Sequence, residues 1–150
     1  MDKKSLRREL MHELWRMNKM HLIVTLQEFV EGETATLAYL NDVAQPKITP
    51  SMISDNLRIS RARAANILRS LRGKGFVRMD IAEDDRRKMY VFITDKGKKH
   101  LSDKQQFLTD YFDLYVEVLG EEDTKELIRL IRKTADNERL LTDESKGEVE

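Results

Sequence analysis

The 150-residue sequence contains no cysteine, only two prolines and six glycines, and no long uninterrupted apolar run. Without cysteine the chain cannot form disulfides, thiolate metal sites or thiol-based redox sensors, which is consistent with a cytoplasmic protein. A membrane-spanning helix needs about 20 consecutive apolar residues, so no membrane partner is expected. The N-terminus also lacks the short apolar core of a secretory signal.

An excess of one charge is lacking as well, because 27 basic residues balance 27 acidic ones. The balance nevertheless changes along the chain. Residues 48–100 hold 13 basic and 6 acidic side chains, a net charge of +7, and residues 101–150 hold 7 and 14, a net charge of −7. The basic middle is a candidate anion-binding region, although two solvated faces of unequal sign would give the same totals.

Apolar periodicity predicts a mainly α fold for a chain long enough to form one domain. Residues 5–30 are expected to form one amphipathic helix of about 25 residues that buries more than one face. A shorter helix is expected from Thr34 to about Val43. Further helices are expected from Thr94 or Asp95 to Gly120 and from about 121 to 140, and residues 142–150 are expected to be a flexible tail.

The centre of the sequence predicts a helix-turn-helix. Thr49 is the expected N-cap of a helix that ends near Leu57, and Ser60 is the expected N-cap of a helix over 61–72. Only about three residues separate the two helices, as this motif requires. Residues 76–81 and 89–93 have strand propensity and flank the charged segment 82–88, which indicates a β-hairpin.

The helix over 61–72 has an apolar side that is expected to face the core and a polar side that carries arginines and one asparagine. Arginine can donate twice to guanine and asparagine can pair with adenine, whereas capped helix N-termini bind phosphates. The alternative is a surface helix made soluble by its arginines. The candidate DNA-binding residues in these two helices are Thr49, Ser51, Ser60, Arg61, Ala62, Arg63, Ala65, Asn66 and Arg69.

The segments ITPSMISDNLRISRARAANILRSLRGKGFV at 48–77 and DDRRKMYVFITDKGKKHL at 84–101 resemble the winged helix-turn-helix of the MarR family, the multiple-antibiotic-resistance regulators. The wing motif of that family is matched by Asp85, Arg87, Thr94 and Gly97. One departure is Met79, which stands where the family has a basic residue. The candidate DNA-binding residues of the wing are Asp85, Arg86, Arg87 and Lys88.

The resemblance implies a single MarR-like domain over 1–150, with a DNA-binding lobe at about 34–100. Long flanking helices at about 5–31 and 101–141 would form a dimerisation platform. In this family the wing arginine, here Arg87, would enter a minor groove, and Asp85 would orient it. The implied partners are double-stranded DNA with a palindromic operator, a second copy of the chain and a small-molecule effector.

The function expected from these features is that of a dimeric, sequence-specific transcriptional regulator that represses transcription. Two alternatives remain open, a winged-helix protein–protein adaptor and a non-specific architectural DNA-binding protein. No enzyme motif is found, and no cofactor or metal is expected, because the three histidines have no ligand spacing.

Overall fold

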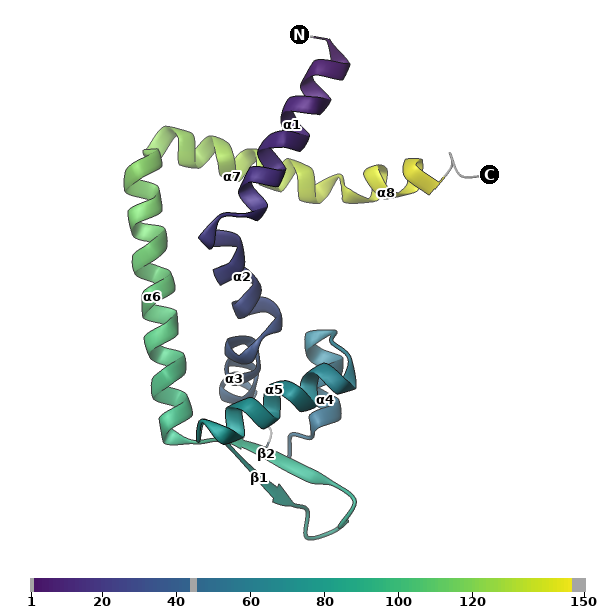
Figure 1. The fold of residues 1–150 in the computed structure, drawn as a ribbon, viewed down its shortest axis with the longest axis vertical. Helices are drawn as coiled ribbons and strands as arrows, with labels where there is room; N and C mark the ends of the chain where they lie inside the picture. The colour runs from purple at the N-terminus through teal and green to yellow at the C-terminus, as the bar shows by residue number, and fades with distance from the viewer. Residues whose placement is uncertain (1, 44–45, 147–150) are drawn as a thin grey trace. The chain divides into compact units, whose positions relative to one another are not determined.

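The computed structural model describes residues 2–43 and 46–146, which are mainly helical with one small β-hairpin, as predicted (Figure 1). The chain divides into two compact units, residues 1–106 and 107–150. The elements are α1 (Lys3–Asn18), α2 (His21–Glu31), α3 (Glu33–Asp42), α4 (Pro50–Leu57), α5 (Arg61–Gly73), β1 (Val77–Ile81), β2 (Met89–Ile93), α6 (Asp95–Leu119), α7 (Glu121–Asp136) and α8 (Glu138–Lys146).

The core of the first unit lies where α3, α4, α5 and the hairpin meet. Leu37, Ile53 and Leu71 are 0% exposed, and Leu68 and Val91 are buried beside them. These side chains come from four elements that are separated in sequence, α3, α4, α5 and β2. Their burial therefore holds α5 against the hairpin and against α3 and α4.

Helices α4 and α5 form the predicted helix-turn-helix. The Thr49 hydroxyl oxygen accepts a hydrogen bond from the Met52 N–H at 3.3 Å, and the Ser60 hydroxyl oxygen accepts one from the Arg63 N–H at 3.1 Å. Both predicted N-caps are thus confirmed. Between the helices Arg58 has a φ of 53°, the left-handed conformation that reverses the chain at a helix end.

The end of α5 is set by Gly75, which has a φ of +77°. The N–H of Phe76 returns to the carbonyl of Leu71 at 2.9 Å, as in the common glycine-terminated helix end. Gly73 is the last residue of the helix itself.

The hairpin pairs β1 and β2 antiparallel, from Val77 opposite Ile93 to Ile81 opposite Met89. The strands lie within one residue of their predicted bounds. The free edge of β2 is partly covered, because the Val91 N–H donates to the carbonyl of residue 48 at 2.8 Å. This bond ties the hairpin to the segment that leads into α4.

The turn from β2 into α6 explains the Thr94 and Gly97 of the wing motif. The Thr94 hydroxyl accepts a hydrogen bond from the Gly97 N–H at 3.1 Å and donates to the Gly75 carbonyl at 2.7 Å. The first turn of α6 therefore lies directly on the chain that leaves α5. A Cβ atom at position 97 would lie 2.1 Å from the Phe76 carbonyl oxygen, so only glycine fits there.

The prediction of one helix over residues 5–30 is wrong, because the structure has two helices there. After Asn18, the N–H groups of Lys19 and Met20 return only three residues, to the carbonyls of Arg16 and Met17. Met20 is extended, with φ −71° and ψ 144°, and precedes the first residue of α2.

The apolar residues of α1 and α2 do not form one continuous stripe across this break. Continuing the main stripe of α1 into α2 leads to Val24, which is exposed, whereas α2 buries Leu22 and Thr25 instead. The buried side of α2 is thus out of phase with the stripe of α1. One straight helix could not place both stripes on a common face.

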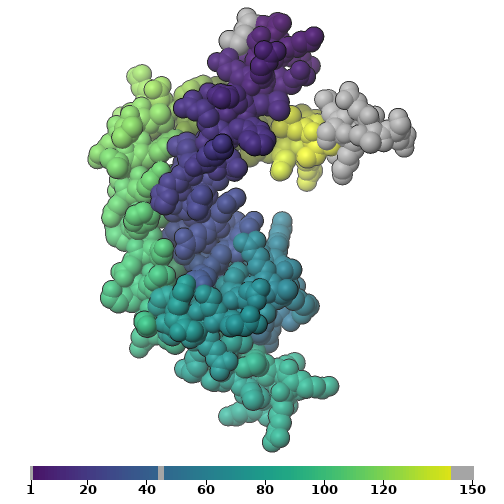
Figure 2. Space-filling model, viewed as in Figure 1, coloured from purple at the N-terminus to yellow at the C-terminus, as the bar shows by residue number. Residues whose placement is uncertain are grey.

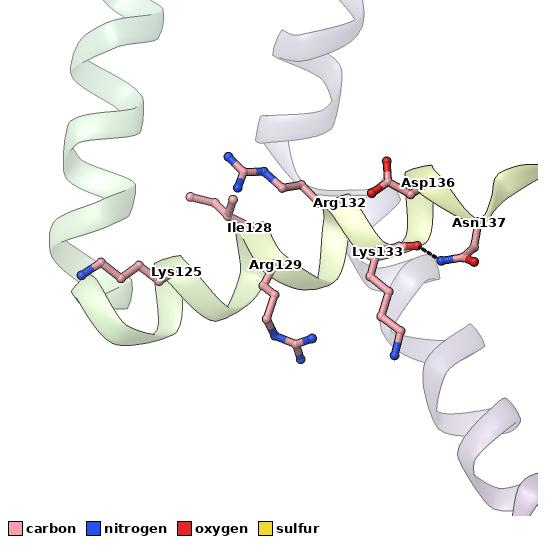
Figure 3. Close-up of a pocket in the computed structure, with 7 residues that line it drawn as sticks. All are labelled: Lys125, Ile128, Arg129, Arg132, Lys133, Asp136 and Asn137. Carbon is pink, nitrogen blue, oxygen red and sulfur yellow. Dashed lines mark hydrogen bonds between the residues drawn. The ribbon is translucent and has the colours of Figure 1, made fainter.

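The second unit contains the end of α6 together with α7 and α8. The helix predicted over 121–140 is interrupted at Asn137, whose side-chain amide donates to the Lys133 carbonyl at 2.7 Å (Figure 3). The expected flexible tail at 142–150 is helical as far as Lys146, and residues 147–150 lie outside the described residues.

Replacement of Gly97 by alanine is expected to destabilise the fold by about 1–3 kcal/mol or more, because its Cβ atom would overlap the Phe76 carbonyl. Gly73→Ala is the matched control. No atom lies within 4 Å of a Cβ atom at position 73, and alanine in a helix is favoured over glycine by roughly 0.5–1 kcal/mol. Urea unfolding of both variants at one protein concentration measures the difference. Equal stability of the two would contradict the close approach of α6.

Candidate nucleic-acid interface

The outward side of α5 is arranged as the helical wheel predicts. Ala64, Leu68 and Leu71 are buried, whereas Asn66 and Arg69 are exposed. The remaining outward candidates are also exposed: Ser60, Arg61, Ala62, Arg63 and Ala65. Two small residues among longer polar ones leave room for another surface to approach closely.

Asn66 and Arg69 are held together on this face. An Arg69 guanidinium nitrogen donates to the Asn66 amide oxygen at 3.1 Å. An amide oxygen has two acceptor positions, so one acceptor and the whole amide NH₂ group remain for another partner. The pair presents donors and an acceptor in a defined direction, which is the chemistry that base edges recognise.

The N-termini of α4 and α5 are brought together by Arg61. Its guanidinium donates to the Ser51 hydroxyl at 2.7 Å, and Thr49 and Ser60 cap the two helices. The candidates of both helices therefore form one surface. Helix N-termini carry partial positive charge and unpaired N–H groups, so this surface favours anions such as phosphate.

The wing ends in a hydrogen-bonded pair formed by Asp85 and Arg87. One Asp85 carboxylate oxygen accepts hydrogen bonds from the Arg87 N–H at 3.0 Å and from its side-chain Nε at 3.2 Å. Arg87 remains 92% exposed while Asp85 is 28% exposed. Arg86 and Lys88 beside them are also exposed, and the hairpin stands out from the rest of the first unit (Figure 2). Asp85 therefore fixes the direction of an otherwise free guanidinium.

Arg78 is the basic residue next to Met79, which stands where the family motif has a basic residue. The structure pairs Arg78 with Asp80 at 2.9 Å and places its guanidinium 4.7 Å from the centre of the Phe92 ring. Met79 is half-buried on the opposite side of the strand. Arg78 therefore stabilises the outer face of the hairpin and already has two partners there.

Asp84 and Tyr90 close the base of the wing tip. The Tyr90 hydroxyl donates to the Asp84 carboxylate at 3.2 Å. Hydrogen bonds from its own backbone N–H and from Tyr90 hold the pKa of the Asp84 carboxyl below its ordinary value. The carboxylate is therefore ionised at neutral pH and keeps the tip folded back on β2.

Sequence reasoning missed one partner of the candidate site. The guanidinium of Arg63 donates to the Glu31 carboxylate at 3.2 Å, although the two residues are 32 positions apart in the chain. No short-range motif could have found this pair, because it forms only where the end of α2 comes near the start of α5 in the folded chain.

The part of the chain that the structure describes does not meet the requirements of a metal site or of a membrane-spanning helix, and its groove along α7 is open. It contains no group of three or more histidine or acidic side chains that could hold a metal ion, and none of its helices is long and apolar enough to cross a membrane. The groove drawn in Figure 3 is lined by residues of α7 and the adjacent Asn137, so it is an open helix face rather than an enclosed pocket.

Comparison with known proteins agrees with this arrangement. Over 82 residues the chain is 34% identical to YwaE of Bacillus subtilis, described as an uncharacterized helix-turn-helix-type transcriptional regulator. The match covers 53% of this chain and 46% of YwaE, so the chain spans about half the length of this relative. No protein-family model matches the chain.

Solved structures with a similar fold are transcriptional regulators. A mutant of MepR from Staphylococcus aureus is 20% identical, with a TM-score of 0.63 over 91% of this chain and 98% of MepR. A MarR transcriptional regulator of Methanosarcina mazei is 20% identical, with a TM-score of 0.55 over 91% and 99%. The transcriptional repressor CouR, solved with a 23-mer DNA duplex, is 25% identical, with a TM-score of 0.54 over 68% and 71%.

The fold and the arrangement of α4, α5 and the hairpin define a winged helix-turn-helix protein. This fold is similar to that of solved MarR-type regulators, which supports at the level of the fold the resemblance noted in the sequence. The proteins that it resembles are regulators of transcription rather than enzymes, in agreement with the expectation from the sequence.

Proposed function

We propose that this protein is a dimeric, cytoplasmic transcriptional regulator that binds a palindromic operator in double-stranded DNA. The observation that carries the proposal is the pairing of Arg87 with Asp85 at an exposed wing tip on the same lobe as the arginine-bearing face of α5. A helix of this kind enters a major groove, and an arginine at a wing tip suits an adjacent minor groove. An adaptor protein would need neither feature.

Sequence specificity is supported by the Asn66–Arg69 pair. A protein that only bridges phosphates needs positive charge, whereas this pair also offers an acceptor and directed donors to base edges. Ala62 and Ala65 beside the pair leave space for base edges or a thymine methyl group.

Repression and release by a small molecule form the finer part of the proposal. CouR, which has a similar fold, is described as a transcriptional repressor bound to DNA, and MepR has been solved with ethidium bromide. For this chain we propose that the protein blocks transcription by binding its operator until a small-molecule effector lowers its affinity for DNA.

A homodimer is supported by apolar side chains that a single copy leaves exposed. On α1 these include Leu10, Leu14 and Trp15, and Trp15 is 69% exposed. The second unit likewise exposes Ile131 and other apolar residues. Exposed apolar side chains that cluster on one helix commonly mark an interface.

Charge complementarity supports pairing between two copies. Residues 2–19 carry six basic and three acidic side chains, a net charge of +3, whereas residues 107–123 carry six acidic and no basic ones, a net charge of −6. Opposite charges around apolar residues favour association of α1 from one copy with the acidic segment of the other.

The proposed function is tested by selecting bound duplexes from randomised DNA. We expect the retained pool to contain an inverted repeat whose half-sites lie about one helical turn, roughly 10 bp, apart. Asn66→Ala should cost about 1–3 kcal/mol in specific binding and relax the base preference at particular positions. A pool without sequence preference would indicate an architectural protein, and the absence of binding would favour the adaptor.

The wing pair makes a separate prediction. Arg87→Ala is expected to weaken specific binding and to lower the salt slope of the affinity by about one, because one cationic contact is lost. Asp85→Ala is also expected to weaken binding. Without Asp85 the Arg87 side chain would no longer be held in one direction in the free protein, so it would lose more conformational entropy when it binds. Fluorescence anisotropy over a series of salt concentrations measures both effects.

Glu83→Ala is the matched control for Asp85→Ala, since it removes a carboxylate from the same exposed turn. Simple electrostatics predicts slightly tighter binding for both variants. If Asp85→Ala behaves like Glu83→Ala, the orienting role of Asp85 is wrong.

The homodimer is tested by sedimentation equilibrium at micromolar concentration. The wild-type protein should sediment at twice its chain mass of 17.6 kDa. Its dimer should dissociate more readily at high salt, because salt screens the attraction between opposite charges. Leu10→Glu should yield monomers, because it places a charge within the exposed apolar stripe of α1. Ile81→Glu, which changes an equally exposed residue of the wing, should leave the dimer intact. A stable 17.6 kDa wild-type species would overturn the proposal.

A further inference from the structure

Helix α5, which we propose to enter the major groove, is linked by ion pairs near both of its ends to a single corner of the chain, the junction between α2 and α3 at residues 31–33. Near its start, the Arg63 guanidinium lies 3.2 Å from the Glu31 carboxylate, and just after its end, the Lys74 ammonium lies 2.7 Å from the Glu33 carboxylate. Glu31 is the last residue of α2 and Glu33 is the first residue of α3, with only Gly32 between them.

The two ion pairs differ in character. Glu33 is only 25% exposed. Partial burial opposes its ionisation, but hydrogen bonds from Lys74 and Ser70 outweigh this effect and hold the pKa of Glu33 below its ordinary value. The Glu33–Lys74 pair therefore acts as a fixed clamp at the end of α5.

The Glu31–Arg63 pair is solvated, with about half of each side chain exposed. An ion pair in this setting contributes little to stability and exchanges partners easily. Arg63 nevertheless belongs to the face of α5 that we propose to contact DNA. Its neighbours Arg61 and Arg69 donate to neutral oxygen atoms, whereas Arg63 donates to a carboxylate.

We propose that Glu31 is a positioning residue that holds the guanidinium of Arg63 in the free protein and competes with DNA phosphate for it. This inference rests on the proposed DNA-binding function. The carboxylate occupies one of the five N–H donors of the guanidinium, offsets its positive charge and directs it toward the end of α2, so a phosphate contact has to compete with this ion pair. Glu31 therefore lowers the affinity for DNA.

The location of Glu31 gives this restraint a structural consequence. It ends α2, which is a separate helix from α1, and it acts on a residue in the first turn of α5. A shift of α2 relative to α5 would change the grip of Glu31 on Arg63. The corner thus connects the position of α2 with the charge that α5 offers to DNA.

The test neutralises Glu31 without changing its shape. The Glu31→Gln variant is expected to bind the selected operator about 2- to 5-fold more tightly, which corresponds to the loss of one solvated ion pair. The salt slope of its affinity should rise by about one, because Arg63 becomes available for one more phosphate contact. Asp103→Asn is the control, because it neutralises a carboxylate that is paired with Lys99 on α6, outside the corner. The control should leave the salt slope unchanged.

A double-mutant cycle with Arg63→Ala separates competition from a general charge effect. In the Arg63→Ala background, Glu31→Gln should have no effect on affinity or slope beyond that of the Asp103→Asn control. Far-UV circular dichroism and urea unfolding of each variant check that the fold is retained.

Each outcome bears on a different claim. If Glu31→Gln matches the control, or if it weakens binding, the competition between Glu31 and phosphate is wrong while the proposed function stands. If the wild-type protein retains no DNA from a randomised pool, the proposed function itself fails.

Discussion

Burial of Leu68 and Leu71 in the core of the first unit determines which side of α5 meets the solvent. Fully burying a leucine side chain stabilises a fold by about 1.5–3 kcal/mol, so a rotation of α5 that exposed either residue would be unfavourable. Asn66 and Arg69 are consequently held outward, although neither contributes to the core. The same cluster includes Val91 of β2, so it also fixes the root of the wing.

On this rigid base, short hydrogen bonds direct the polar groups before any partner arrives. The guanidinium groups of three arginines each donate a hydrogen bond to a nearby side-chain oxygen: Arg69 to Asn66, Arg61 to Ser51 and Arg87 to Asp85. Long arginine side chains otherwise lose considerable rotamer freedom on binding. Holding three of them in advance lowers that loss at both the helix face and the wing tip. The Glu31–Arg63 pair opposes this effect, because it directs one arginine toward an acidic residue of the protein itself.

Features that depend on near neighbours in the chain were predictable. The N-caps at Thr49 and Ser60 were indicated by residue type and spacing, and the Asp85–Arg87 pair by the resemblance to the wing motif; each joins residues two or three positions apart. The break between α1 and α2 was not predicted, because no proline or glycine marks it. The role of Arg78 was also missed, since its contact with Phe92 depends on the register of the two strands.

By itself, the sequence determined the class of fold, the bounds of α5 to within one residue, and the side of that helix which faces solvent. These properties follow from helical periodicity, capping and turn residues, all of which act over a few positions. The tertiary structure alone decided that Arg63 meets Glu31 and that residue 97 must be glycine. Both depend on elements far apart in sequence that approach closely in the packed lobe, and no local pattern records such an approach.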